Sequence, residues 1–259
     1  MSAKIPVFRT VGESYAFAAT NLRLWFPWAW PAISLSLVGI LILRDAQYPV
    51  WVAFAAIPVM LGQFVLIAPM LILCQLRILM GAVQPDLRFG RILFSSQCLK
   101  TAGLLFLWDS IFGHGVGTPM GVLIFLALMG IPLEYAIALT VVVTLLVWWP
   151  LVYAASRLLP MFPLIAAERG NTLRAALQLT KGSAHRISAV IVLVLAPILA
   201  VSIPAGVGLF DLLERKHVNL TALGGVGHIA MTMVSIALGI LPMLVLAVAI
   251  SHCVKRLSP

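Results

Sequence analysis

Long apolar runs, separated by short polar segments, account for most of this 259-residue chain. Several of the runs reach the roughly 20 residues that a helix needs to cross the hydrocarbon core of a bilayer. No polar stretch between them is long enough to build a soluble domain of its own. The pattern therefore predicts an all-α integral membrane protein with a single domain over residues 1–259. The apolar runs are 24–43, 50–76, 92–112, 119–133, 135–158, 187–210 and 226–252.

The basic residues decide how many of these runs cross the membrane. Fourteen of the 17 Lys and Arg residues fall in four clusters, and such residues in short loops accumulate on the cytoplasmic side. Six crossings with both termini in the cytoplasm place all four clusters there, whereas seven would move the cluster at 157–186 to the far side. We therefore predict a polytopic transmembrane bundle with residues 1–23 as a cytoplasmic segment. The six predicted spans are 24–43, 50–76, 92–133, 135–158, 187–210 and 226–252.

The predicted third span, 92–133, is interrupted at 113–121 by the sequence GHGVGTPMG. Backbone groups freed by such a break are tolerated at membrane depth only inside protein or beside a water-filled cavity. An alternative places 92–112 on the cytoplasmic surface and makes 119–133 the crossing. Both versions give the same sidedness for the rest of the chain.

Composition and charge narrow the classes of function. Hydrophobic residues make up 62% of the chain and charged residues only 10%, far below the quarter or so that is usual in globular proteins. The net charge of +9 indicates contact with a membrane surface, because no nucleic-acid-binding motif accompanies it. The first apolar run is too long for the core of a signal peptide, so we expect an uncleaved span. The three cysteines, predicted to be small buried hydrophobes, are Cys74, Cys98 and Cys253.

The sequence contains no catalytic motif and no metal-ligand spacing among its five histidines, so we expect neither enzymatic activity, nor a metal, nor another cofactor. Asp109 and His114 lie beside the interruption of the third span, and Lys100 precedes them. Charged groups inside a bilayer usually face a bundle interior or a cavity, so these three residues are candidates for a polar cavity. The alternative is that Asp109 lies near an interface and is simply solvated.

The segment ERGNTLRAALQLTKGS, residues 168–183, has the pattern of a short amphipathic helix. Asn171 can cap its start and Gly182 can supply a left-handed stop. Apolar and polar positions between them fall on opposite faces, which predicts a helix at about 171–181 lying flat at the membrane interface. Upstream, Pro160 and Pro163 predict a bent, extended exit from the fourth span.

Five cations around this segment form a candidate site for anionic lipid headgroups or for a protein partner. Each cation near an anionic leaflet contributes about 1 kcal/mol to the attraction. The alternative is that the cluster only enforces topology and anchors the fifth span. This basic cluster consists of Arg157, Arg169, Arg174, Lys181 and Arg186.

The same region carries a resemblance to a known family. Arg157, Pro160, Pro163, Glu168 and the run AALQLTKG at 175–182 resemble a signature of the glycerophosphoryl diester phosphodiesterase membrane-domain family and its uncharacterised six-span relatives. In that family the phosphodiesterase chemistry belongs to a separate soluble domain, which we do not expect here. The resemblance implies a multi-pass protein of the bacterial inner membrane, associated with lipid.

From these observations we expect a non-catalytic membrane protein that acts as a lipid-interacting module or as an accessory subunit of a membrane complex. Its expected partners are anionic lipid headgroups on the cytoplasmic side and another membrane protein, but not nucleic acid. A small-solute transporter is the alternative, because many transporters build their binding sites from discontinuous helices such as the interrupted third span.

Overall fold

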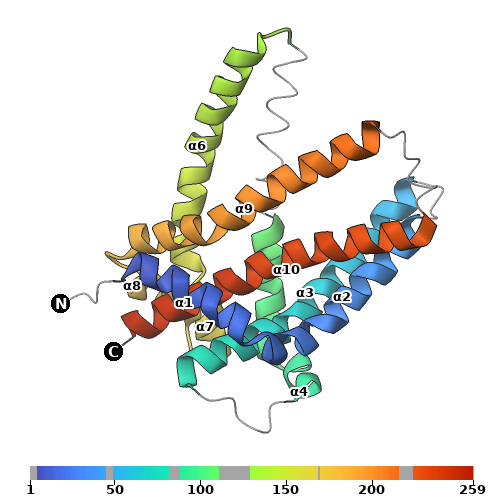
Figure 1. The fold of residues 1–259 in the computed structure, drawn as a ribbon. Helices are drawn as coiled ribbons and strands as arrows, with labels where there is room; N and C mark the ends of the chain where they lie inside the picture. The colour runs from blue at the N-terminus through green and yellow to red at the C-terminus, as the bar shows by residue number, and fades with distance from the viewer. Residues whose placement is uncertain are drawn as a thin grey trace.

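The computed structural model describes residues 5–44, 49–81, 88–110, 129–168, 170–215 and 224–258, and every regular element within these ranges is a helix (Figure 1). One further helix covers 96–110. The labelled helices are α1 (Val7–Thr20), α2 (Leu22–Arg44), α3 (Pro49–Met80), α4 (Phe89–Leu93), α6 (Leu133–Leu158), α7 (Met161–Ala166), α8 (Thr172–Leu179), α9 (Ala184–Arg215) and α10 (Gly224–Leu257).

Three segments of the described residues are long and apolar enough to cross a membrane: Pro58–Met80, Trp148–Ala166 and Ile240–Leu257. A fourth is added if α8 and the first part of α9, which are bent by 96° to each other, count as one span. The all-helical class and the presence of membrane-type helices are therefore confirmed. The number of six crossings stays a prediction, and the predicted interruption at 113–121 lies outside the described residues.

Five of the predicted spans each coincide with a long helix, α2, α3, α6, α9 or α10. At the start of the predicted third span, α4 ends at Leu93 and a new helix begins at residue 96, so the helix within this span starts four residues after residue 92. Ser95 separates them and caps the second helix, since its Oγ accepts a hydrogen bond of 3.1 Å from the backbone N–H of Cys98.

The extended exit predicted from Pro160 and Pro163 is wrong. Leu159 and Pro160 both have right-handed helical backbone angles, so α7 follows α6 after only two residues. Pro163 is the third residue of α7, a position in the first turn where its missing N–H leaves no helical hydrogen bond unmade. The two prolines therefore shape a helical connection rather than an extended one.

Helix α1 lies within the segment that the sequence analysis treated only as a cytoplasmic tail. Its buried face consists of Thr10, Ser14 and Ala18, small residues at every fourth position. Tyr15 Oη donates a 2.6 Å hydrogen bond to the carbonyl oxygen of Val194 in α9. Because this face is small and partly polar, apolar periodicity does not reveal it.

The core is built around the second half of α3. Met70, Ile72 and Cys74 are fully buried, and the helix contacts α2, α7 and α10. At Gly62 the approach of α2 is closest, because a Cβ atom added there would lie 2.7 Å from Leu35 Cδ2. Small residues at helix contacts permit such approach in membrane proteins.

Replacement of Gly62 tests this contact. We expect Gly62→Leu to lower the free energy of unfolding by about 1–3 kcal/mol, because the added side chain overpacks the α2–α3 contact. Thermal and denaturant unfolding of the purified protein in one detergent would measure the change. The matched control is Gly12→Leu on the exposed side of α1, where an added Cβ meets nothing within 4 Å. Equal effects of the two substitutions would contradict the prediction.

Candidate functional site

Helix α8 confirms the predicted cap at Asn171, whereas its C-cap is Thr180 and the left-handed Gly182 lies in the turn that follows. Asn171 Oδ1 accepts a 3.3 Å hydrogen bond from the backbone N–H of Arg174, and Gly182 has a φ of 81°. The helix runs from Thr172 to Leu179, close to the predicted 171–181. A helix of eight residues is short, so its caps and its packing must supply most of its stability.

The two faces of α8 differ in the way that the sequence pattern predicts. Ala176 and the neighbouring Thr180 are fully buried, whereas Arg174, Gln178 and Lys181 are exposed. Leu173 and Leu177 remain partly exposed, at 46% and 37%. The helix therefore offers cations and unburied leucine surface together, which is the side-chain arrangement of an interfacial helix.

The other members of the predicted basic cluster lie on neighbouring elements. Arg157 is half-buried in the last turn of α6, and Arg186 is half-buried in the first turn of α9. Helix α6 contacts both α8, which carries Arg174, and α9, which carries Arg186. Arg169 lies outside the described residues.

Of the three residues predicted for a polar cavity, the structure describes Lys100 and Asp109. Lys100 lines a cleft of about 540 Å³, while Asp109, nine residues further along the same helix, does not line it. His114 lies outside the described residues. Lys100 faces the connection between α7 and α8 instead, and no described member of the predicted basic cluster lines this cleft. The lining of this polar cleft is Ser96, Gln97, Lys100, Ile165, Glu168, Gly170, Asn171, Thr172 and Leu173.

Packing of the helix over 96–110 holds Lys100 at the cleft. Cys98, Thr101 and Leu105 are buried on its inner side. Gln97 Nε2 donates a 3.4 Å hydrogen bond to the carbonyl oxygen of Ala166 at the end of α7. Lys100 is consequently directed outward. Sequence reasoning missed the cleft because its two walls are about 70 residues apart in the chain and no local pattern links them.

Glu168, on the opposite wall, has a backbone conformation that few non-glycine residues adopt. Its φ is 54°, and such a left-handed conformation costs about 1–3 kcal/mol. Its backbone N–H donates a 3.0 Å hydrogen bond to the carbonyl oxygen of Ile165 and closes the turn after α7. The turn thereby positions a carboxylate beside the cleft.

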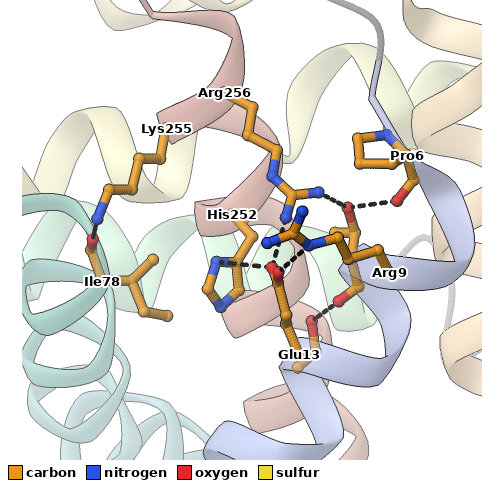
Figure 2. A network of polar contacts seen from close by, with 9 residues as sticks. Pro6, Arg9, Glu13, Ile78, His252, Lys255 and Arg256 are labelled. Carbon is orange, nitrogen blue, oxygen red and sulfur yellow. Dashed lines mark hydrogen bonds and ion pairs between the residues drawn. The ribbon is translucent and has the colours of Figure 1, made fainter.

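A second polar cluster, the α1–α10 latch, joins the two ends of the chain (Figure 2). Arg256 donates a 2.5 Å hydrogen bond to Glu13 Oε2 and a 2.6 Å hydrogen bond to Thr10 Oγ1. Arg9 Nε donates to Glu13 Oε1 at 2.8 Å, and His252 Nδ1 lies 3.8 Å from Glu13 Oε2.

Lys255 makes the equivalent contact to α3, since its Nζ donates a 2.8 Å hydrogen bond to the carbonyl oxygen of Ile78. The last carbonyls of a helix have no partner within it, so this hydrogen bond satisfies one of them. Lys255 and Arg256 were predicted only as topological charges. The structure shows that both also hold helices together.

Comparison of the chain with protein-family models, with curated proteins and with solved structures finds no match. The resemblance described above therefore stays a prediction that rests on residues 157–182. Within the described ranges no three His, Cys, Asp or Glu residues are placed to hold a metal ion.

The latch predicts unequal roles for its two arginines. The Arg256 side chain is 23% exposed and that of Arg9 is 76% exposed. We expect Arg256→Gln to lower the free energy of unfolding by about 1.5–3 kcal/mol, because it removes charged hydrogen bonds that are partly shielded from water. Arg9→Gln should cost less than about 1 kcal/mol, as exposed ion pairs usually do. Denaturant unfolding in detergent measures both losses, and similar losses would contradict the unequal roles of the two arginines.

Proposed function

We propose that this protein is a non-catalytic integral membrane module that binds phospholipid headgroups at the cytoplasmic face of a bacterial inner membrane. The observation that carries the proposal is α8, a capped helix bent by 96° from α9 that leaves its cations and part of its leucine surface exposed. If α9 crosses the bilayer, a helix at this angle to it lies nearly parallel to the membrane plane.

Electrostatics favours headgroup binding over an internal role for these charges. In the described part of the chain, Arg174 and Lys181 have no carboxylate within ion-pair distance. Each therefore keeps its attraction for lipid phosphates, about 1 kcal/mol per cation at an anionic surface. The unburied surface of Leu173 and Leu177 adds an apolar contribution when it enters the acyl boundary.

The arrangement of the helix ends supports the sidedness in this proposal. The hydrogen bond from Lys255 to Ile78 brings the carboxyl ends of α3 and α10 together, and the latch adds α1 to the same end. In Figure 1 the two termini and α8 lie at the same end of the molecule. Several basic clusters thus gather at one end, as the positive-inside rule requires of a cytoplasmic face.

A role as an accessory subunit is compatible with the lipid module and has its own support. One side of α6 carries an exposed apolar stripe at alternating spacings of four and three residues, which is the spacing of a helix-packing seam. Tagged purification in mild detergent would detect a stoichiometric partner there. The stripe consists of Tyr135, Leu139, Val142, Leu146, Trp149 and Tyr153.

The transporter alternative gains no support from the described residues. It depended on the interruption at 113–121 and on a cavity shared by Asp109, His114 and Lys100. The interruption and His114 lie outside the described residues, and Asp109 does not line the cleft that contains Lys100. We therefore do not advance it.

The α8 cations can be tested directly. In native nanodiscs we expect the wild-type protein to retain anionic lipid above its fraction in the bulk membrane. Arg174→Gln combined with Lys181→Gln should remove about 1 kcal/mol of attraction per cation and bring the retained lipid close to the bulk fraction. The charge-preserving pair Arg174→Lys and Lys181→Arg is the matched control. Unchanged enrichment in the neutral variant would refute the headgroup role of α8.

Sidedness is tested by labelling a single exposed position. We expect Gln178→Cys to react with a membrane-impermeant thiol reagent only from the cytoplasmic side. Cys74, Cys98 and Cys253 are buried, so the native thiols should contribute little background. Labelling of residue 178 from the periplasmic side alone would exclude the six-span arrangement with both termini in the cytoplasm.

A further inference from the structure

Two opposite charges line the polar cleft, and neither has an ion-pair partner among the residues that the structure describes. These charges belong to Lys100 and Glu168. A cleft of about 540 Å³ lies within the range of about 300–1,000 Å³ that is usual for small-molecule sites. An ammonium and a carboxylate on opposite walls complement a ligand that carries an anion and a cation close together.

The other polar residues that line the cleft suit a phosphodiester. Ser96 and Thr172 supply hydroxyl groups to the cleft. The start of α8 is not what makes this site, because Asn171 already occupies one of its free N–H groups. The anion must therefore be held chiefly by Lys100 and the hydroxyl groups, which leaves Glu168 to meet a positively charged group.

An apolar track begins directly beside the cleft. Leu99, Gly103 and Leu107 follow each other at intervals of four residues along the helix over 96–110, so they lie on one side of it. Both leucines are exposed, and a Cβ atom added at Gly103 would meet nothing within 4 Å. The track between Leu99 and Leu107 is about 12 Å long, and the missing side chain at Gly103 leaves a depression in the middle.

The surroundings place this track among acyl chains. Phe94, next to the cleft, is 88% exposed, a degree of exposure that is unfavourable in water for so large an apolar side chain but not at the boundary of a bilayer. Exposed apolar residues therefore flank the polar cleft and continue away from it. A ligand with a zwitterionic head and an apolar tail matches both parts.

We propose that the polar cleft and the apolar track together bind one phospholipid with a primary ammonium headgroup, such as phosphatidylethanolamine. Lys100 binds the phosphodiester, Glu168 accepts hydrogen bonds from the ammonium, and one acyl chain lies along Leu99, Gly103 and Leu107. The left-handed backbone at Glu168 is consistent with this role, because the turn directs its carboxylate to the cleft at a conformational cost. The inference rests on the proposed function, since it requires this end of the molecule to lie at the interface.

The test is lipid binding by the purified full-length chain, followed by native mass spectrometry. The probes are phosphatidylethanolamine and phosphatidylglycerol with identical acyl chains. We expect the variant with Arg174→Gln and Lys181→Gln, in which α8 no longer attracts anionic lipid, to bind phosphatidylethanolamine about 10-fold more tightly than phosphatidylglycerol, the effect of one added charged hydrogen bond. Glu168→Gln should abolish this preference by weakening phosphatidylethanolamine alone, whereas the control Glu134→Gln, an equally neutralising change on exposed α6, should retain it.

Two further variants examine the other contacts. Lys100→Gln should weaken both lipids by about 5-fold, because both contain the phosphodiester, and Arg23→Gln is its control. Gly103→Leu should weaken the diacyl lipids but leave the binding of glycerophosphoethanolamine, which has no acyl chains, unchanged. Lys100, Gly103 and Glu168 are all exposed, so these changes should leave unfolding temperatures unaltered.

The outcomes separate this inference from the proposed function. In the protein with neutralised Arg174 and Lys181, equal affinity for the two lipids, or a preference that survives Glu168→Gln, overturns the phospholipid site. If that happens while neutralisation of Arg174 and Lys181 still removes anionic lipid enrichment, the headgroup function of α8 stands alone. If the cleft variants behave as expected and the α8 variants have no effect, the cleft is the lipid site and the proposed headgroup binding by α8 is refuted.

Discussion

The fold depends on the packing of one helix, the second half of α3. Its side chains from Ala68 to Gln75 are almost inaccessible, and α2, α7 and α10 all contact it. In a bilayer these contacts gain little from the hydrophobic effect, because lipid tails are as apolar as leucine. Close packing of the helices must therefore supply the stabilisation that the hydrophobic effect does not, as it does where Gly62 meets Leu35. This packing also offsets the cost, about 1–3 kcal/mol, of Gln75, whose side-chain amide has no hydrogen-bond partner within the described structure.

The basic residues at one end of the bundle serve two different purposes. Lys255 and Arg256 are satisfied within the protein, by the carbonyl oxygen of Ile78 and by Glu13. Arg174, Lys181 and Lys100 have no such partners among the described residues and are exposed. All of these are basic residues in a hydrophobic chain, so composition alone does not distinguish them. Their partners distinguish cations that build the fold from cations that remain available to a ligand.

The sequence was informative where a structure depends on neighbouring residues. Asn171 predicted the start of α8, Gly182 predicted the left-handed turn that follows the helix, and the long apolar runs located most of the long helices. It failed where the determining contact is distant: α1 is held by contacts to α9 and α10, and its buried face is too small and polar to stand out. Pro160 and Pro163 were misjudged because a proline breaks a helix only beyond its first turn.

The candidate site, too, was predictable from the sequence only where it depends on single residues. Arg174, Lys181 and Lys100 could be selected from the sequence because charge is rare in this chain. The cleft beside Lys100 could not be predicted, because it forms only when the helix over 96–110 meets the end of α7. In the sequence, Glu168 stands out only as part of the family resemblance. No sequence signal marks its left-handed backbone, where a glycine would be the expected residue.

The shortness of α8 has a consequence for how lipid and structure influence each other. Eight residues do not form a stable helix in isolation, and α8 buries little more than Ala176 and the adjoining Thr180. A ligand that binds only the folded helix stabilises it in proportion to its concentration and affinity. Because Asn171, Thr172 and Leu173 form both the first turn of α8 and one wall of the cleft, a lipid held there would order the helix that presents Arg174 and Lys181. If both proposals hold, occupation of the cleft and attraction of the wider leaflet would be coupled through the same turn of helix, and by linkage each would strengthen the other.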